Sequence, residues 1–319
     1  MTLLIIIVNF RTPDLTIGCL RSLAPEVAAN PGTRVVLVEN GSGDDSLSRL
    51  ADAIDRSGWQ NWVTLIPSPA NFGFAGGNNL GLREGLARAP ADLVLLLNSD
   101  TIVHPGCLAH SVSVLDDATI GAMSCKLLNA DGTIQNVSRR FPTPARLICS
   151  ALGLPWRLPR FFEWADTDDP NWDRDRTARD VDWIGGAFLL IRADLLSRLG
   201  GLDDAFFFYG EDIVLCHRVR RAGCRVRYDP GSSTTHLGGS SSDPSRMAAK
   251  LRNIHAWRAR YLVLRRCHGP LAAWIVRATD ILSFGLRTIL WRLRGPDQPK
   301  YADSRDAFRL LTRPLEASK

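Results

Sequence analysis

The sequence predicts an α/β fold in which helices cover both faces of a mostly parallel sheet, followed by a basic helical tail. In the first hundred residues, compact runs rich in Val, Ile and Leu alternate with segments of helical spacing, the order typical of a parallel sheet. With 45% hydrophobic and 23% charged residues among 319, the composition excludes a disordered or fibrous chain. This length favours one large α/β domain with an appendage.

Four apolar runs are expected as the first strands: Leu3–Val8, Arg34–Val38, Trp62–Ile66 and Leu93–Leu97. Three intervening segments are expected as helices: Asp14–Ala28, Asp44–Arg56 and Gly77–Arg88. The first apolar run lacks a basic segment before it and soon meets Asn9 and Arg11, so we interpret it as a buried strand rather than a signal peptide.

Small polar residues follow each of these strands. In parallel sheets, ligands bind beyond the carboxyl ends of the strands. Any one such cluster is ordinary turn chemistry, but four in succession indicate a binding site. The clusters are Asn9, Glu39–Asp45, Asn71–Asn79 and Asn98–Asp100.

The second part of the domain is less regular. Residues 139–180 hold five prolines and several tryptophans, and they are expected to form an irregular, flexible loop that acts as a functional flap. The other expected features are a strand at Ile120–Cys125, a hairpin turn at Asn129–Gly132, a strand at Val181–Arg192 broken by two glycines, a helix from about Asp212 to Gly223, a strand at Cys224–Tyr228 and a polar segment Gly231–Ser245.

The C-terminal tail differs from the rest in charge. Residues 246–319 carry sixteen Lys or Arg and five Asp or Glu, whereas the other 245 residues carry 23 and 28. This excess predicts an anionic partner, either nucleic acid or a membrane surface.

The stretch 270–294 favours the membrane. As a helix it places Arg277, Asp280, Arg287 and Arg294 along one face and Trp274, Ile275, Ile281, Leu282, Ile289 and Leu290 on the other. This pattern is typical of a helix that lies in a membrane interface without crossing it. An apolar face of this kind argues against nucleic acid, which needs basic residues and stacking aromatics along a groove.

The seven cysteines are widely spread and include no C-x-x-C pair, which argues against a zinc site or a redox dithiol. We therefore expect buried thiols in a reducing compartment. Together with the tail, this predicts a cytoplasmic protein that is peripheral on the inner face of the cell membrane.

Seven motifs, in order from Leu3 to about Ser242, resemble the family 2 inverting glycosyltransferases, and among them most closely the bacterial rhamnosyltransferase group. The motifs are VNFRT at 8–12, VENGSGDDS at 38–46, NFGFAGGNN at 71–79, LLLNSDT at 95–101, VDWIGGAFLLIR at 181–192, GGLDDAFFFYGEDIVLC at 200–216 and TTHLGGSS at 234–241.

The resemblance implies a GT-A fold, which is Rossmann-like, over residues 1–245. Residues 1–100 would form the nucleotide-binding half and 101–245 the acceptor half with its flexible 139–180 loop, and 246–319 would form the helical tail. It also implies a nucleoside-diphosphate-sugar donor, Mg²⁺ or Mn²⁺ as cofactor, and a displacement that inverts the anomeric carbon.

Asp100 matches the acid that binds the metal in this family, and His236 matches a histidine that reaches the metal or the diphosphate. A metal held by carboxylates would stabilise the negative charge of a departing diphosphate. The residues alone leave other interpretations open, since Asp often caps a turn and a lone loop His is often a surface residue.

Asp212 matches the general base, with Glu211 as a supporting acid. An acceptor hydroxyl needs a carboxylate to take its proton, and a helix N-terminus favours an ionised acid. The alternative is an ordinary acidic first turn of a helix.

Other motif positions match the donor and acceptor pockets. Glu39 would accept a hydrogen bond from N3–H of uracil or thymine. The implied donor-binding residues are Asn9, Glu39, Asn71, Phe74, Gly77, Asn78, Asn98 and Asp100, and those beside the sugar and acceptor are Trp183, Gly185 and Gly186.

Two positions depart from the family pattern, which usually has Asp at both. Glu39 keeps the carboxylate with one more methylene. Val214 removes a charge near the proposed base, which we interpret as the loss of a supporting group.

The expected function is transfer of rhamnose from dTDP-rhamnose to a lipid-linked or cell-surface glycan acceptor. Galactofuranosyl, glucosyl and N-acetylglucosaminyl transfer stay open, as does the oligomeric state. The alternative from another class is a degenerate sugar-nucleotide-binding scaffold protein at the membrane, suggested by Glu39 and Val214.

Overall fold

The computed structural model describes residues 1–136, 138–168, 172–238, 246–295 and 299–312, with side chains except at 246–254. The chain divides into two units. Unit 1 comprises Met1–Arg139 and Pro170–Ala248, and unit 2 comprises Arg140–Asp169 and Ala249–Lys319. This differs from the expected boundary at 245, because residues 140–169 belong with the helical tail. The reason is a shared core: Leu147 packs with Leu264 and Val276 of the tail helices.

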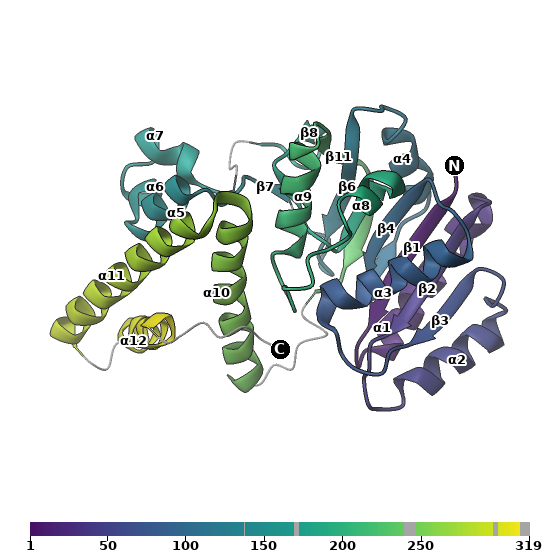
Figure 1. Cartoon of the computed structure of the whole chain (residues 1–319), viewed down its shortest axis with the longest axis horizontal. Coiled ribbons are helices and arrows are strands. Elements are labelled where there is room, and N and C mark those ends of the chain that lie inside the picture. The colour runs from purple at the N-terminus through teal and green to yellow at the C-terminus, as the bar shows by residue number, and fades with distance from the viewer. Residues whose placement is uncertain (137, 169–171, 239–245, 296–298, 313–319) are drawn as a thin grey trace. The chain divides into compact units, whose positions relative to one another are not determined.

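Unit 1 is built on a mixed sheet in the order β3-β2-β1-β4-β10-β6-β11-β5, with β8 added beside β11 (Figure 1). Strands β3, β2, β1 and β4 run parallel, as do β6 and β11, whereas β10 runs antiparallel to both β4 and β6. The bounds are β1 Leu3–Asn9, β2 Thr33–Glu39, β3 Val63–Pro67, β4 Leu93–Asn98, β5 Thr101–Val103, β6 Ile120–Leu128, β8 Arg179–Asp180, β10 Phe188–Arg192 and β11 Arg225–His236. The expected mostly parallel sheet is confirmed.

The helices of unit 1 follow the predicted order to within a few residues, except that the helix at Cys107–Val114 was not predicted. They are α1 Pro13–Ala29, α2 Ser46–Ser57, α3 Gly73–Arg88, α4 Cys107–Val114, α8 Ala193–Arg198 and α9 Glu211–Arg221. A two-stranded sheet joins β7 Ser138–Arg139 to β9 Trp183–Ile184. The seven cysteines are free thiols, and four of them are buried.

The continuous apolar run of β1 is explained by burial on both faces. Leu3, Ile5 and Ile7 belong to the main hydrophobic cluster with Leu20 and Leu23 of α1. On the opposite face, Leu4 and Ile6 contact glycines of α3 so closely that a Cβ at Gly81 would lie 2.5 Å from Ile6 Cγ2. Helix α3 can therefore lie close to the sheet only because this face carries glycine.

Gly81→Ala is therefore expected to lower the free energy of unfolding by about 1–3 kcal/mol, because the added methyl overpacks the core against Ile6 and Val38. Gly18→Ala in α1 is the matched control, since its Cβ would meet only Ile102 Cδ1, at 3.9 Å. The control should gain about 0.5–1 kcal/mol from helix propensity. Urea unfolding measures both, and equal effects would contradict this account of the α3 packing.

Two segments differ from expectation. Residues 139–180, expected as an irregular loop, contain α5 Pro144–Ala151, α6 Leu154–Arg157, α7 Pro159–Phe162 and the short 3₁₀ helix η1 Glu163–Ala165. Prolines 144, 155 and 159 lie in the first turns of these helices, where proline is favoured. Strand β11 continues to His236, through part of the segment expected to be polar loop, because residues 233–236 pair with β6 and β5.

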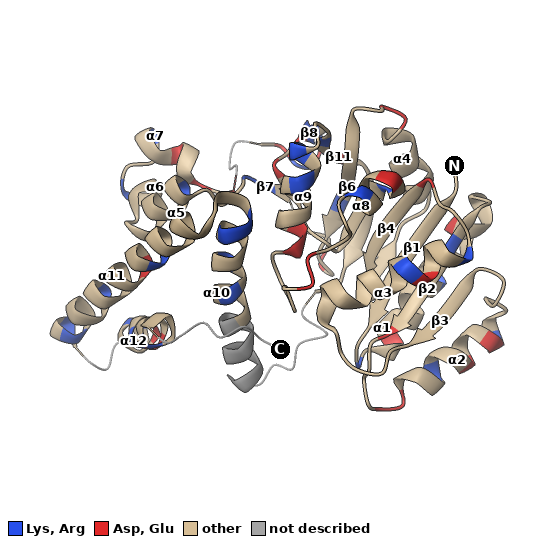
Figure 2. Ribbon diagram, viewed as in Figure 1, with Lys and Arg blue, Asp and Glu red and all other residues tan. Residues whose placement is uncertain are grey.

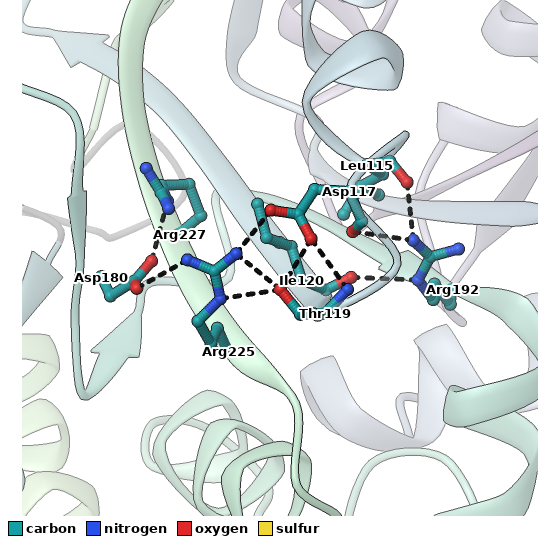
Figure 3. A network of polar contacts seen from close by, with 8 residues as sticks. All are labelled: Leu115, Asp117, Thr119, Ile120, Asp180, Arg192, Arg225 and Arg227. Atoms are coloured by element: carbon teal, nitrogen blue, oxygen red, sulfur yellow. Dashed lines mark hydrogen bonds and ion pairs between the residues drawn. The ribbon is translucent and has the colours of Figure 1, made fainter.

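A network of charged side chains fastens the sheet edge that leads to Trp183 (Figure 3). Arg225 of β11 donates hydrogen bonds to Asp180 of β8 at 3.0 Å and to Thr119 at 2.9 Å, and it also contacts Asp117. Hydrogen bonds from Thr119, assisted by Arg225, lower the pKa of Asp117 to about 2. The network holds β8 against β11 and so fixes the start of the segment that carries β9.

Unit 2 is helical. Besides α5–α7 and η1 it contains α10 Arg246–His268, which begins at the end of unit 1, α11 Pro270–Arg294 and α12 Pro299–Thr312. Its core is formed by Leu147, Tyr261, Leu264, Val276 and Leu311. Among the helices of the described ranges, none combines the length and the apolar character needed to cross a bilayer.

Helix α11 has the expected bounds, but its polar side chains are turned inward. Arg277 donates to the carbonyl oxygen of Leu311 at 2.9 Å, and Arg287 donates to that of Ala151 at 2.8 Å. Asp280 is 2% exposed and accepts from Tyr261 at 2.8 Å. These three side chains share one face, as expected, and that face lies inside unit 2, because the carbonyls at the C-terminal ends of α5 and α12 accept from the two arginines and Tyr261 donates to Asp280.

Candidate functional site

The predicted donor residues of the first two strands lie at one edge of the sheet. Asn9 ends β1 and is paired in register with Glu39, which ends β2, while Asn98 pairs with Val8. The parallel strands of unit 1 thus bring three separate motifs together at their carboxyl ends, as predicted from the sequence.

Asn9 presents an unused hydrogen-bond donor at this edge. Its side chain is fully buried, and Oδ1 accepts a hydrogen bond from Thr16 Oγ1 at 2.8 Å. Its Nδ2 has no partner within the described structure. Because an unsatisfied buried donor is costly, this atom is suited to a ligand's acceptor.

Glu39 organises the loop that follows β2. Its Oε1 accepts from the backbone N–H of Ser42 at 2.9 Å. Ser42 in turn accepts from Arg11 through both its hydroxyl and its carbonyl oxygen, each at 2.9 Å. Glu39 therefore ties the loop after β2 to the loop after β1, a role that the sequence did not indicate.

The 71–79 motif is fixed largely by its own packing. Asn40 donates to Asn71 Oδ1 at 3.0 Å and to the carbonyl of Gly73 at 3.1 Å. Gly77 faces Val8, whose Cγ1 would lie 2.8 Å from an added Cβ, and Asn78 donates to the carbonyl of Phe74. For Gly77 and Asn78 the structure thus supplies a packing explanation beside the predicted donor role.

Asp100 and His236 lie side by side. Strand β11 pairs with β5 so that His236 is opposite Thr101, and His236 Nε2 is 3.2 Å from Asp100 Oδ1. Asn98 Nδ2 is 3.1 Å from the same nitrogen. Asp100 is only 5% exposed. Two residues 136 positions apart in sequence are therefore adjacent, as the resemblance implies.

Gln135, which the sequence did not single out, orients the histidine. Its Nε2 donates to the carbonyl of His236 at 2.7 Å, and its Oε1 lies 2.8 Å from His236 Nδ1. Because that oxygen only accepts, Nδ1 carries the hydrogen, and in the neutral ring Nε2 presents its lone pair toward Asp100. The only cue available in the sequence was its position just after the hairpin turn.

These residues fit a divalent cation. A carboxylate oxygen and an imidazole lone pair 3.2 Å apart both gain from a shared cation, and the carboxylate is a ligand that suits Mg²⁺ or Mn²⁺. Within the described ranges, no cluster of three or more His, Cys, Asp or Glu side chains could hold a metal ion. A diphosphate would have to supply part of the remaining coordination, which is the usual arrangement for Mg²⁺.

Gln135→Leu is expected to weaken Mn²⁺ binding by about 10–100-fold, since partners that orient a metal-binding histidine contribute on that scale. Calorimetry with Mn²⁺ and a nucleoside diphosphate measures the affinity. Gln60→Leu, at an exposed position, is the control and should bind Mn²⁺ like the parent. Unchanged affinity in Gln135→Leu would remove Gln135 from the site.

Asp212 lies in the first turn of α9, beside the glycine pair of the β9–β10 segment. Its Oδ2 accepts from the N–H of Gly186 at 3.2 Å and its Oδ1 from that of Ile213 at 2.8 Å. The ring of Phe74 lies against Gly186, at 3.1 Å from the Cβ that any other residue would carry there. Asp212, Gly186 and Phe74 therefore meet, although they come from three motifs.

Glu211 and Asp212 form a coupled acidic pair. Burial, reinforced by the charge of Asp212, raises the pKa of Glu211 well above its usual range. Burial also raises the pKa of Asp212, but backbone N–H groups oppose this rise. Glu211 is 5% exposed, and its Oε2 has no partner among the described residues. We infer that Glu211 holds the proton of the pair and that Asp212 ionises first.

Three aromatic residues come just before this pair in the chain. Phe207, Phe208 and Tyr209 are each about two-fifths exposed, and Tyr209 has a φ of 70° in the left-handed region. Asn79 supports the loop before them by donating to the carbonyl of Leu202 at 2.8 Å. The sequence reasoning missed Asn40 and Asn79 as supports because their partners are distant in the chain.

Trp183 and Gly185 lie on the same segment, Trp183 in β9 and Gly185 just after it. Ile184 of β9 pairs with Ser138 of β7. Val214, which departs from the family pattern, is buried in α9 with 2% exposure.

The family comparison agrees with these motifs. A family model described as "Glycosyltransferase like family 2" matches residues 2–258. The chain is 31% identical over 242 residues to an N-acetylglucosaminyl-diphospho-decaprenol L-rhamnosyltransferase of Mycobacterium tuberculosis, covering 70% of this chain and 74% of the relative.

A second relative is the low-salt glycan biosynthesis hexosyltransferase Agl10 of Haloferax volcanii, 27% identical over 164 residues. The match covers 51% of this chain and spans about half of that relative, 48% of its length.

Among solved structures, the mannosyltransferase PcManGT from Pyrobaculum calidifontis, in complex with GDP-Man and Mn²⁺, aligns over 97% of this chain and 84% of its own with a TM-score of 0.57. At 16% identity this likeness concerns the fold alone, and it confirms the predicted GT-A architecture.

Proposed function

Because the chain belongs to glycosyltransferase family 2, we propose that it transfers a sugar from a nucleoside-diphosphate donor to a lipid-linked or surface-glycan acceptor with inversion at the anomeric carbon. Rhamnose from dTDP-rhamnose is the proposed donor, supported by the L-rhamnosyltransferase relative that matches 70% of this chain. The name of that relative includes a diphospho-decaprenol, which supports a lipid-linked acceptor.

The donor would enter at the carboxyl ends of β1, β2 and β4. Asn9 Nδ2 would donate to the nucleotide, and Glu39 would accept from the N3–H of its base. Asn71 and Phe74 would line the same pocket, and Asn98 would hold His236 toward the diphosphate. The unpartnered state of Asn9 Nδ2 supports this assignment.

Asp100 and His236 would hold Mg²⁺ or Mn²⁺, with Gln135 orienting the histidine. When bound, the ion neutralises the negative charge that develops on the diphosphate.

Asp212 would take the proton of the acceptor hydroxyl as its oxygen bonds to the anomeric carbon. The bond to the diphosphate breaks on the opposite face of that carbon, so its configuration inverts. The N–H groups of Gly186 and Ile213 orient the carboxylate. Protonated Glu211 would donate to the acceptor, and Trp183 with Gly185 and Gly186 would border the sugar.

The observation that carries this proposal is the adjacency of Asp100, His236 and Asn98 at the sheet edge beyond β4. A thermal-shift screen of the purified chain against nucleoside-diphosphate sugars with Mn²⁺ tests it. We expect dTDP-rhamnose to raise the melting temperature, and only in the presence of the metal, because a ligand that binds the folded state stabilises it. If no sugar nucleotide in the panel raises the melting temperature, the proposal is contradicted.

A further inference from the structure

The outward side of α11 is apolar along its whole length. The side chains of this outer stripe, defined here as Leu271, Trp274, Leu282, Leu286, Ile289, Leu290 and Leu293, are each more than half exposed. The helix has 25 residues, so the stripe is about 35–40 Å long. Soluble proteins rarely expose so long an apolar surface unless it binds something.

The inward polar contacts fix this orientation. Arg277 and Arg287 are tied to the last carbonyls of α12 and α5, and Asp280 is tied to Tyr261 of α10. Val276 is fully buried in the core of unit 2. Rotating α11 to hide the outer stripe would break all of these contacts, so the exposure is a property of the folded unit.

The charges around the outer stripe select its partner. Asp280, the only acidic residue of α11, is buried, so the exposed side of the helix carries no carboxylate. Exposed basic residues stand at both ends: Arg265 and Arg266 before the helix, and Arg292, Arg294 and Lys300 at and beyond its C-terminal end. Figure 2 shows this C-terminal end in blue, with few charges along the rest of α11. Apolar length with basic ends complements an anionic bilayer surface.

Aromatic residues reinforce this match. Trp274 is 67% exposed near one end of the helix. Near the other end, Arg294 and Lys300 lie over the ring of Trp291, at 5.3 and 5.1 Å from its centre. Tryptophan and arginine are side chains that place an apolar body in lipid and a polar end at the headgroups.

A second exposed apolar group lies beside the same helix. Arg287 and Ser283 both bind the carbonyl of Ala151, and the chain that leaves this point exposes Trp156 at 73% and Phe161 at 69%. Arg157 and Arg160 are exposed between them. This segment was expected to form part of an irregular functional flap, whereas it belongs to unit 2.

We propose that unit 2 binds the surface of a bilayer that contains anionic lipid, with the outer stripe of α11 in the headgroup boundary and the 152–161 segment as a second contact. The basic ends of the helix bind lipid phosphates. This binding needs neither donor nor metal, so its failure and the failure of the proposed transferase activity are distinguishable.

Co-sedimentation with phosphatidylglycerol/phosphatidylcholine vesicles tests the proposal on the full chain. Leu282→Glu/Leu286→Glu/Ile289→Glu is expected to weaken binding by about 100-fold or more, because three exposed apolar side chains that would enter the lipid become charged. Leu47→Glu, on the exposed surface of α2 in unit 1, is the matched control and should bind like the parent. Truncation at residue 269 is avoided, because it would remove Val276 and Leu311 from the core around Leu147.

Circular dichroism and a thermal melting curve check that the triple variant folds. If the triple variant does not fold, the alternative test measures how vesicles of brominated phospholipid quench the tryptophan fluorescence of the parent chain. Substituting Phe for Trp156 and Trp274 should reduce that quenching. Vesicle binding by the folded triple variant equal to that of the parent overturns the proposal. The proposal is also overturned if the parent chain does not bind the vesicles. This holds even if light scattering shows that the chain dimerises and that a second copy covers the outer stripe.

Discussion

Asp212→Asn is expected to keep the fold and donor binding but to transfer sugar about 10²–10⁴-fold more slowly than the parent. The amide keeps the shape of the side chain and can still accept through its oxygen from Gly186 or Ile213, but it no longer takes a proton. Single-turnover transfer assays with saturating donor measure the effect, and the melting temperature checks the fold.

Asp194→Asn is the matched control, because Asp194 also lies in the first turn of a helix but pairs only with Arg198 at the surface in the contacts described. It should transfer sugar at the parental rate. Glu211→Gln should keep more activity than Asp212→Asn, because the amide replaces an acid that is already protonated. Near-normal transfer by Asp212→Asn removes this residue as the base.

Asp100→Ala is expected to lower metal-dependent donor affinity by about 100-fold or more, since it removes a carboxylate that faces His236. His236 would be left as the main protein ligand, and neutral imidazole alone compensates the charge of the ion poorly. Calorimetry of donor binding with and without Mn²⁺ separates the metal-dependent part.

Asp116→Ala serves as the control for Asp100→Ala, because Asp116 is an exposed acid after α4. It should bind donor and Mn²⁺ like the parent. If Asp100→Ala also bound both with parental affinity, the metal would have to be held elsewhere in the chain.

The sequence was sufficient for the nucleotide-binding half of unit 1 because its signals are local. Apolar runs such as Leu3–Val8 are buried on both faces and match their strands almost to the residue. Parallel pairing brings the polar ends of these strands together. This follows from the strand topology and does not depend on which side chains the strands carry. Hence Asn9 and Glu39, predicted separately, are paired in register.

The remaining features depend on contacts between distant segments. Gln135 can orient His236 only because β11 places the histidine beside it. No local sequence pattern predicts this contact. The pattern of α11 placed Arg277, Asp280 and Arg287 on one face, but it could not show that this face lies inside or that Ile281 packs against the same core. The carbonyls that bind Arg277 and Arg287 belong to other helices. The helices within residues 144–165 were not predicted because prolines usually indicate a loop. Proline is compatible with a helix in its first turn, and the sequence alone did not show that these prolines lie there.

The most direct test of the proposed inverting transfer is the anomeric configuration of the product. Proton NMR of the sugar transferred from dTDP-rhamnose to a lipid-linked N-acetylglucosaminyl-diphosphate acceptor, with Mn²⁺ present, reports it. A single displacement assisted by Asp212 predicts a product whose anomeric configuration is opposite to that of the donor. A product that retains the donor's configuration would contradict the account.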